Sequence, residues 1–173
     1  MNLPVGCFRH QGGVYRGHNP RWAYQPESGE GARLHGGRWN PAGTPALYTS
    51  TRFQTAWLEA QQGFVYKTQP LTLCTYDVDC GPILDLTDTD NLSRYNIPQE
   101  ALGCAWLSQH LQGFTPDSWV VASRLMSDGI AGIQVASQAV GATAEDINVV
   151  FWSWSRQPPN QVVVVDDDGR LKR

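Results

Sequence analysis

The sequence has few charged residues. Asp, Glu, Lys and Arg make up 17% of its 173 residues, which is a low share for a soluble domain. The formal net charge is −3 at pH 7. Because contacts to phosphate groups supply most of the affinity of a general nucleic-acid binder, this balance argues against that class. We therefore expect no direct binding of nucleic acid by this chain.

Long apolar runs and a secretion signal are also missing. No stretch approaches the ~18 apolar residues that a membrane-spanning helix needs. The N-terminal segment MNLPVGCFRHQGG has neither a basic start nor a long apolar run, unlike a signal peptide. We therefore expect a cytoplasmic protein without a membrane span.

Metal-binding spacings are absent as well. The cysteines (Cys7, Cys74, Cys80 and Cys104) form no CxxC pair, and the four histidines form no HExxH motif. We expect no metal ion and no prosthetic cofactor, and we interpret the cysteines as small core residues with reduced thiols.

The sequence is rich in tryptophan, and its first third contains arginine but no lysine. Seven tryptophans are many for this length, and some should lie at a pocket or interface, because the indole N–H needs a partner. The planar guanidinium group binds phosphate or carboxylate through paired hydrogen bonds, so the arginine pattern favours recognition of an anion. Ordinary surface arginines are the alternative. The arginines are Arg9, Arg16, Arg21, Arg33, Arg38 and Arg52.

The length predicts one domain over residues 1–173, with a core at about residues 10–166 and a polar C-terminal tail. Strand and helix patterns are mixed without a regular βαβ alternation, so the expected fold class is α+β, with a mixed or antiparallel sheet and flanking helices. We expect strands at 13–17, 46–50, 70–78, 82–88, 130–137, 147–154 and 161–167, helices at 51–63, 97–113 and 115–129, and a functional loop at 18–45.

The predicted helix at 51–63 begins after a candidate N-cap, Ser50 or Thr51, and Gly63 can end it. An apolar stripe that contains Trp57 is expected to face the core, with Glu59 at its edge. The stripe consists of Phe53, Trp57 and Ala60, and the adjoining edge of Arg52, Ala56 and Glu59.

Four side chains could form one site. Arg16 stands at a strand end, Arg38 in a Gly-rich turn, Tyr48 on the next strand and Glu59 on the following helix. Guanidinium groups can hold an anionic nucleotide and an aromatic ring can stack on a base. A carboxylate can stabilise the oxocarbenium-like state that forms when an N-glycosidic bond breaks. Structural alternatives exist for each: an ion pair for Arg38, core packing for Tyr48, and a solvated helix position for Glu59.

Residues 14–59 resemble the RES domain, a family of bacterial toxins from toxin–antitoxin pairs. The family pattern has an early Tyr-Arg pair, a Gly-rich segment that contains Gly-Gly-Arg-Trp-Asn, a later Tyr, and a helix that carries Glu. The matching residues are Tyr15-Arg16, Gly29, Gly31-Ala32, Gly36-Gly37-Arg38-Trp39-Asn40, Gly43, Tyr48 and Glu59.

The family is named after an Arg, a Glu and a Ser. Arg16, or alternatively Arg38, matches the first and Glu59 the second. The family's serine usually follows a proline at the end of a late strand, with an Asn on the next strand. Ser137 and Asn148 match these positions, although alanine replaces the proline. Weaker candidates for the serine, both in a helical pattern, are Ser118 and Ser123.

The resemblance implies an NAD+-consuming enzyme whose fold is similar to that of the ADP-ribosylating toxins, with NAD in a cleft between two small sheet layers. Family members degrade NAD+ by hydrolysis or phosphorolysis, and some transfer ADP-ribose to a protein. The usual partner is an Xre-type helix-turn-helix antitoxin. For this chain the resemblance therefore implies NAD+ as substrate, such an antitoxin as partner, and water, phosphate or a protein as acceptor.

The resemblance also implies roles for individual residues. Two arginines would hold phosphate, Tyr48 would stack on or orient the nicotinamide, and Glu59 would bind the ribose and stabilise the cation. The expected catalytic residues are Arg16, Glu59 and Ser137, and the expected NAD-binding residues are Arg16, Arg38, Tyr48 and Asn148.

Four further side chains could belong to the site or to the framework of the fold. We expect Trp57 in the core rather than at a ligand. Trp39 could form a wall of the pocket or support the Gly-rich turn, of which we favour the support, and Trp22 could contact NAD or an antitoxin. His35 is either an acid–base group or the donor of a structural hydrogen bond. Two rival functions stay open: a non-catalytic binding module for an anionic partner, and a nuclease or RNA-binding toxin, against which the net charge argues.

Overall fold

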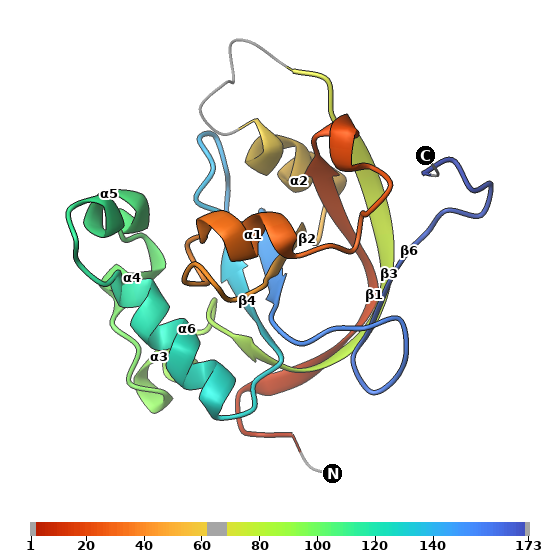
Figure 1. Ribbon diagram of the computed structural model, residues 1–173. Coiled ribbons are helices and arrows are strands. Elements are labelled where there is room, and N and C mark those ends of the chain that lie inside the picture. The colour runs from red at the N-terminus through yellow and green to blue at the C-terminus, as the bar shows by residue number, and fades with distance from the viewer. Residues whose placement is uncertain (1–2, 62–68, 172–173) are drawn as a thin grey trace.

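Figure 1 shows a computed structural model of the chain, which describes residues 3–61 and 69–171. The strands are β1 (Cys7–His18), β2 (Leu47–Ser50), β3 (Thr72–Asp85), β4 (Gly132–Ala136), β5 (Ile147–Phe151) and β6 (Gln161–Val164). They form a six-stranded sheet in the order β1-β2-β5-β4-β3-β6, with an additional pairing of β1 and β3. This pairing closes five of the strands into a ring, and β6 pairs with the edge of β3 that also pairs with β4.

The sheet is mixed, and helices flank it. The β3–β4 pairing is parallel, whereas the pairings of β1 with β2 and of β1 with β3 are antiparallel. The predicted α+β class with a mixed sheet and flanking helices is confirmed. The helices are the short 3-10 helix η1 (Pro20–Trp22), α1 (Glu30–His35), α2 (Phe53–Ala60), α3 (Thr89–Arg94), α4 (Gln99–Leu102), α5 (Trp106–Leu111) and α6 (Asp117–Ser127).

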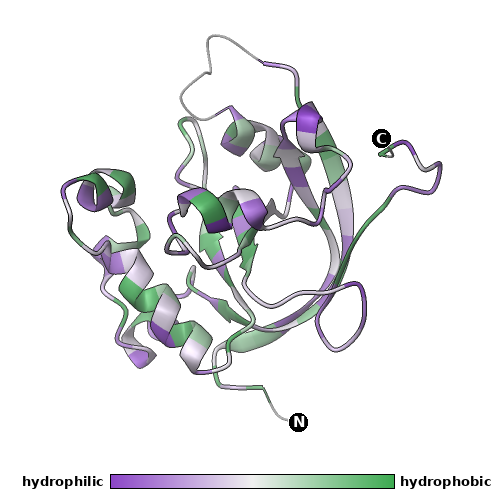
Figure 2. Cartoon of the chain, in the orientation of Figure 1, coloured by the Kyte–Doolittle hydropathy of each residue, from purple (hydrophilic) through white to green (hydrophobic). Residues whose placement is uncertain are grey.

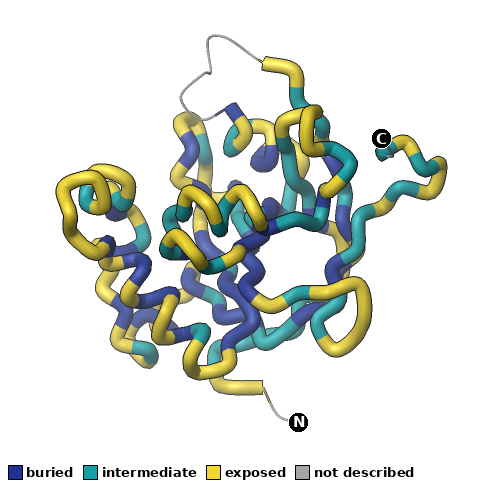
Figure 3. The backbone as a smooth tube through the Cα atoms, in the orientation of Figure 1, coloured by how far each residue is buried: buried dark blue, intermediate teal, exposed yellow. Residues whose placement is uncertain are grey.

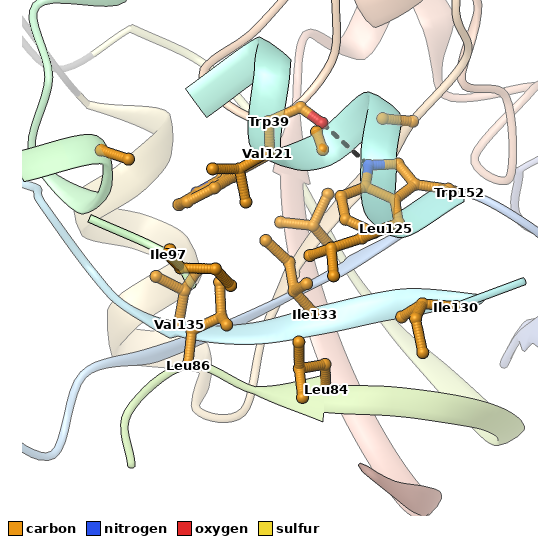
Figure 4. Close-up of a cluster of buried hydrophobic side chains, with 14 of the residues drawn as sticks. Trp39, Leu84, Leu86, Ile97, Val121, Leu125, Ile130, Ile133, Val135 and Trp152 are labelled. Atoms are coloured by element: carbon orange, nitrogen blue, oxygen red, sulfur yellow. Dashed lines mark hydrogen bonds between the residues drawn. The ribbon is translucent and has the colours of Figure 1, made fainter. Parts of the chain in front are cut away.

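Two hydrophobic clusters stabilise this arrangement. One lies between α6 and the sheet, where Leu125 packs near Ile133 and Leu84 (Figure 4). The other lies around β1, β3 and β5 and contains the fully buried Tyr76 and Phe151. Hydrophobic and hydrophilic residues alternate along α6 (Figure 2), as expected for a helix with one buried face. Cys74, Cys80 and Cys104 are buried free thiols and Cys7 is partly buried, so the core prediction is confirmed for three of them.

Several predicted elements have different boundaries. The strands expected at 70–78 and 82–88 are one continuous strand, β3. The helix expected at 97–113 is interrupted between α4 and α5, where Gly103 to Ala105 leave the helical conformation. The loop expected at 18–45 contains η1 and α1. The helix α3 was not predicted, because its six residues show no apolar period; the Asp88 side chain caps it by accepting a hydrogen bond from the Asp90 N–H.

The expected cap of α2 is wrong. The N-cap residue is Arg52, and the two hydroxyl groups proposed as caps bind elsewhere. Ser50 Oγ donates to Asn148 Oδ1 at 2.7 Å, and Thr51 Oγ1 donates to the Ile147 carbonyl at 3.2 Å. Both hydroxyls therefore tie β2 to β5. The proposed helix end at Gly63 lies outside the described residues.

The expected orientation of α2 is also wrong. Phe53 is 52% exposed and Trp57 is 42% exposed, whereas Thr55 and Ala56 are buried. Trp57 of the predicted stripe therefore faces solvent instead of the core. The other two stripe residues touch β1: the Phe53 ring packs against Tyr15, and a Cβ atom added to Gly17 would lie only 2.9 Å from the Ala60 Cβ atom.

The helix α5 lies at the surface of the fold. No residue of α5 is buried, and the segment around it is drawn as exposed in Figure 3. Among the helices of residues 3–61 and 69–171, none is long and apolar enough to cross a membrane.

Candidate active site

A cavity of about 450 Å³ lies where β1, β2, β5, α2 and the Gly-rich turn meet. Five of the six predicted site residues line it, and they come from five different parts of the chain. Ser137 lies immediately beside the wall, between the lining residues Ala136 and Gln138. The lining residues among the predicted set are Arg16, Arg38, Tyr48, Glu59 and Asn148.

The carboxylate of Glu59 is held by two side chains from the sheet. Its Oε1 atom accepts hydrogen bonds from Ser137 Oγ at 2.6 Å and from Asn148 Nδ2 at 2.5 Å. The Asn148 amide is oriented in turn, because its Oδ1 atom accepts the bond from Ser50 Oγ. Hydrogen bonds to a charged acceptor are short and strong, so they fix the direction of the carboxylate.

Close packing of α2 on β1 brings Glu59 to the same cavity as Arg16. The Cβ atom that Gly17 lacks would also lie 3.3 Å from the Ala56 carbonyl oxygen, so a larger residue would push the helix away. Gly17 follows Arg16 directly, and Glu59 precedes Ala60, the residue in closest approach. The small size of Gly17 therefore allows one cavity to contain both charged groups.

The Arg16 side chain is anchored by two main-chain carbonyl groups. Its Nη1 atom donates to the carbonyl oxygens of Pro26 at 3.0 Å and Ser28 at 3.1 Å. Burial lowers the pKa of the nearby His18 to about 4, and the positive charge of Arg16 adds to this shift. His18 is therefore neutral at pH 7, and Arg16 carries the positive charge near it.

The second arginine projects from a tight turn. Arg38 Nη1 donates to the Cys104 carbonyl at 2.5 Å, between α4 and α5. The preceding Gly36 has a φ of +71°, a conformation that side chains other than glycine rarely adopt. The Gly37 carbonyl accepts a hydrogen bond from Trp119 Nε1 at 2.7 Å. The turn that carries Arg38 is thus held by hydrogen bonds to Cys104 and Trp119.

The Tyr48 hydroxyl forms hydrogen bonds with that turn. It accepts a hydrogen bond from the Trp39 backbone N–H at 2.9 Å and donates to Asn40 Oδ1 at 2.7 Å. Burial raises the pKa of Tyr48 far above its usual value, so the phenol stays neutral. A Cβ atom on Gly37 would lie 2.4 Å from this hydroxyl. Tyr48 lines the cavity with its ring, but its polar atom holds the protein turn.

Asn40 completes the support. The side chain is fully buried, and its Nδ2 atom donates to the carbonyl oxygens of Ala32 and Thr44, both at 2.8 Å. Trp39 is 2% exposed, packs in the main core and also lines the cavity. Its carbonyl accepts a hydrogen bond from Trp152 Nε1 at 2.8 Å (Figure 4). The contacts of Gly37, Trp39 and Asn40 therefore fix the turn from which Arg38 projects.

The other candidates lie elsewhere. His35 is exposed on α1, and Arg33 forms a surface ion pair with Glu30 at 2.6 Å. Ser118 is fully buried next to Cys104, and Ser123 is exposed on α6. None of these described residues lines the cavity, and neither does Trp22, which is 51% exposed.

Three residues of the site were not predicted as site residues from the sequence. Trp106 and Gln138 line the cavity, and Ser50 orients Asn148. Only Gln138 had a signal, since it follows Ser137. Trp106 was hidden because one continuous helix was expected where α4 and α5 are separate. In the part of the chain that the structure describes, no group of three or more His, Cys, Asp or Glu is placed to hold a metal ion.

In this α+β fold, two guanidinium groups and one oriented carboxylate surround a single pocket. The family model of the RES domain matches residues 13–173, so this chain belongs to the RES domain family. A chain of the M. tuberculosis MbcT–MbcA toxin–antitoxin complex, known from a crystal structure, has a similar fold. Its TM-score is 0.69 at 22% sequence identity, over 93% of this chain and 85% of that one. No curated protein sequence matches the chain.

Proposed function

We propose that this chain is the toxin component of a toxin–antitoxin system, and that it degrades NAD+ by cleaving the bond between nicotinamide and ribose. The observation that supports this most directly is the oriented carboxylate of Glu59, which lines one cavity together with Arg16 and Arg38. Membership of the RES domain family supports the same substrate.

In the proposed reaction Glu59 acts as a negatively charged carboxylate and not as a proton donor. The bond from ribose C1′ to the pyridinium nitrogen breaks, both electrons go to the nitrogen, and neutral nicotinamide leaves. Positive charge then spreads over C1′ and the ring oxygen, where Glu59 stabilises it. A lone pair of water or phosphate forms the new bond at C1′, and water loses its proton to the solvent. The products are nicotinamide and either ADP-ribose or its C1′ phosphate ester.

Substrate binding is assigned to the arginines. Arg16 and Arg38 would hold the phosphates, and each charged hydrogen bond contributes about 1.5–3 kcal/mol. A volume of about 450 Å³ falls in the range of small-molecule pockets. Ser137 and Asn148 would act by orienting Glu59, and Tyr48 by holding the turn that carries Arg38.

The proposed partner is an Xre-type helix-turn-helix antitoxin. The structural neighbour belongs to a toxin–antitoxin complex, which supports an antitoxin for this chain too. Because NAD+ is abundant inside cells, the proposed place of action is the cytoplasm. Copurification of the chain with the product of an adjacent gene would test the partner.

The function is tested by incubating the purified chain with NAD+ and measuring free nicotinamide by chromatography, with and without inorganic phosphate. Mass spectrometry of the second product separates ADP-ribose from its phosphate ester. No release under either condition would exclude hydrolysis and phosphorolysis. Label transferred from NAD+ to protein in a lysate would then indicate an ADP-ribosyltransferase, whereas NAD+ binding without any product would indicate a binding module.

A further inference from the structure

We propose that Asp146 is a positioning residue that sets the place of Glu59 in the cavity by joining the three elements that form the carboxylate site. This inference rests on the proposed function. Asp146 lies just before β5, does not line the cavity, and belongs to none of the motifs that suggested the site.

The Asp146 side chain fastens α2 to the segment between β4 and β5. The residue is 5% exposed. Its Oδ1 atom accepts a hydrogen bond of 2.6 Å from Thr55 Oγ1 on α2. Its Oδ2 atom accepts bonds from the Thr143 N–H at 2.7 Å and from Thr143 Oγ1 at 3.0 Å. Three donors thus satisfy a buried carboxylate. We call this set of hydrogen bonds, from Thr55 and Thr143 to Asp146, the joint.

The joint continues through the backbone to the serine. The Asp146 carbonyl accepts a hydrogen bond of 2.7 Å from the Ser137 N–H, so one residue binds Thr55 through its side chain and Ser137 through its main chain. Asn148, the other donor of Glu59, follows two positions later on β5. Asp146 is therefore hydrogen-bonded to one donor of Glu59 and close along the chain to the other.

Thr55 links the joint to Glu59, because both residues lie on α2. The two residues are four apart on α2, so they lie one above the other on the same face. Pulling Thr55 toward Asp146 therefore holds Glu59 toward Ser137 and Asn148. A misplacement of about 1 Å can reduce a reaction rate up to ~10²-fold. By this geometry the joint acts on the reaction step rather than on NAD+ binding, because both arginines come from other elements.

The charged groups around the joint lie on its solvent side. Arg52, at the start of α2, forms an ion pair of 2.7 Å with Glu145, the residue before Asp146. This pair also connects α2 to the same segment, but it is exposed and contributes little. Glu145 thus provides a matched control: it is adjacent in sequence and its side chain joins the same two elements, but that side chain bonds Arg52 and not Thr55, Thr143 or Asp146.

The test compares Thr55→Val, Thr55→Ser and Glu145→Gln. The valine keeps the shape of threonine without its hydroxyl, and the serine keeps the donor. We expect Thr55→Val to lower kcat for nicotinamide release by about ten- to hundredfold, with KM for NAD+ almost unchanged. Thr55→Ser and Glu145→Gln should stay close to wild type. Assays are run well below the melting temperature of each variant, so that unfolding does not contribute.

A second measurement does not depend on activity. Hydrogen–deuterium exchange of the peptide that contains α2 should rise in Thr55→Val and stay unchanged in Glu145→Gln. A Thr55→Val variant with wild-type kcat, or one whose only change is a lower melting temperature, would overturn the positioning role while the proposed function stands. A wild-type chain that releases no nicotinamide would overturn both, and unchanged exchange of α2 would show that the joint does not hold the helix.

Discussion

Glu59 and Ser137 are 78 positions apart in the sequence, and their side chains are joined by a hydrogen bond of 2.6 Å. The carboxylate belongs to α2 and the hydroxyl follows β4, so the bond connects a helix to the end of a strand of the sheet. Asn148 on β5 binds the same Oε1 atom. One oxygen of Glu59 is thus fixed by the protein, which gives the carboxylate a defined orientation toward the cavity.

Glu59→Gln should abolish NAD+ breakdown without unfolding the chain. Glutamine keeps a carbonyl oxygen that can accept the bonds from Ser137 and Asn148, but it lacks the negative charge that stabilises the cation. We expect nicotinamide release to fall by about 10²–10³-fold, with a melting temperature close to wild type. Glu30→Gln, on the surface of α1, serves as control. Wild-type activity of Glu59→Gln would disprove the assigned role.

Arg38→Lys should weaken NAD+ binding more than it slows the reaction. Lysine keeps the charge but loses the planar fork that binds a phosphate through two hydrogen bonds. We expect KM for NAD+ to rise about tenfold, corresponding to the loss of roughly one charged hydrogen bond. Arg33→Lys is the control, because Arg33 forms only a surface ion pair with Glu30. Equal KM values for the two variants would contradict phosphate binding by Arg38.

Tyr48→Phe should cost stability. The variant keeps the ring but leaves the Trp39 N–H and Asn40 Oδ1 without their partner, at about 1–3 kcal/mol. For a chain of this size each kcal/mol corresponds to roughly 2–4 °C in melting temperature. Tyr15→Phe provides a comparison, since Tyr15 packs against Phe53 through its ring. If Tyr48→Phe lost activity with no change in melting temperature, a direct contact of the hydroxyl with NAD+ would replace the turn-holding role.

Gly37→Ala and Gly31→Ala should have opposite effects on stability. The new Cβ atom at position 37 would lie 2.4 Å from Tyr48 Oη and 2.8 Å from Asn40 Oδ1, and such overpacking costs about 1–3 kcal/mol. No heavy atom lies within 4 Å of the corresponding atom at Gly31, in α1, where alanine favours the helix by roughly 0.5–1 kcal/mol. Thermal unfolding of both variants checks this. Equal melting temperatures would mean that the turn adapts to a side chain.

The stability of the chain should fall as the pH drops from 6.5 toward 4, and His18 should account for part of that loss. Burial, helped by Arg16, lowers the pKa of the folded histidine to about 4 from an ordinary value of 6.5. The unfolded chain therefore takes up the proton first, so the stabilisation is complete above pH 6.5 and disappears as the pH approaches 4. His18→Gln should reduce the pH dependence of the melting temperature in this window. An identical slope in both proteins would contradict the assignment.

Local sequence determined much of the site. The Tyr15-Arg16 pair, the Gly-Gly-Arg-Trp-Asn turn and the helix that carries Glu59 lie within 46 consecutive residues, 14–59, and each depends on local chemistry. Gly36 needs its left-handed conformation, and Asn40 satisfies neighbouring carbonyl groups. Such features can be recognised from residue type and spacing, because the interacting atoms are close along the chain.

The α+β class, the residues of the Gly-rich turn and the family can therefore be predicted from the amino-acid sequence. The buried face of α2, in contrast, depends on tertiary packing. Periodicity identifies an apolar stripe, but it does not identify the neighbour that covers it; α2 packs closely on β1 at Gly17 with Thr55 and Ala56 buried and Trp57 exposed. The tertiary structure also brought Ser137, Asn148 and Asp146 to Glu59. Their contacts depend on the pairing of β4 with β5 and of β5 with β2, and such long-range registers come from packing of the whole sheet rather than from any local pattern.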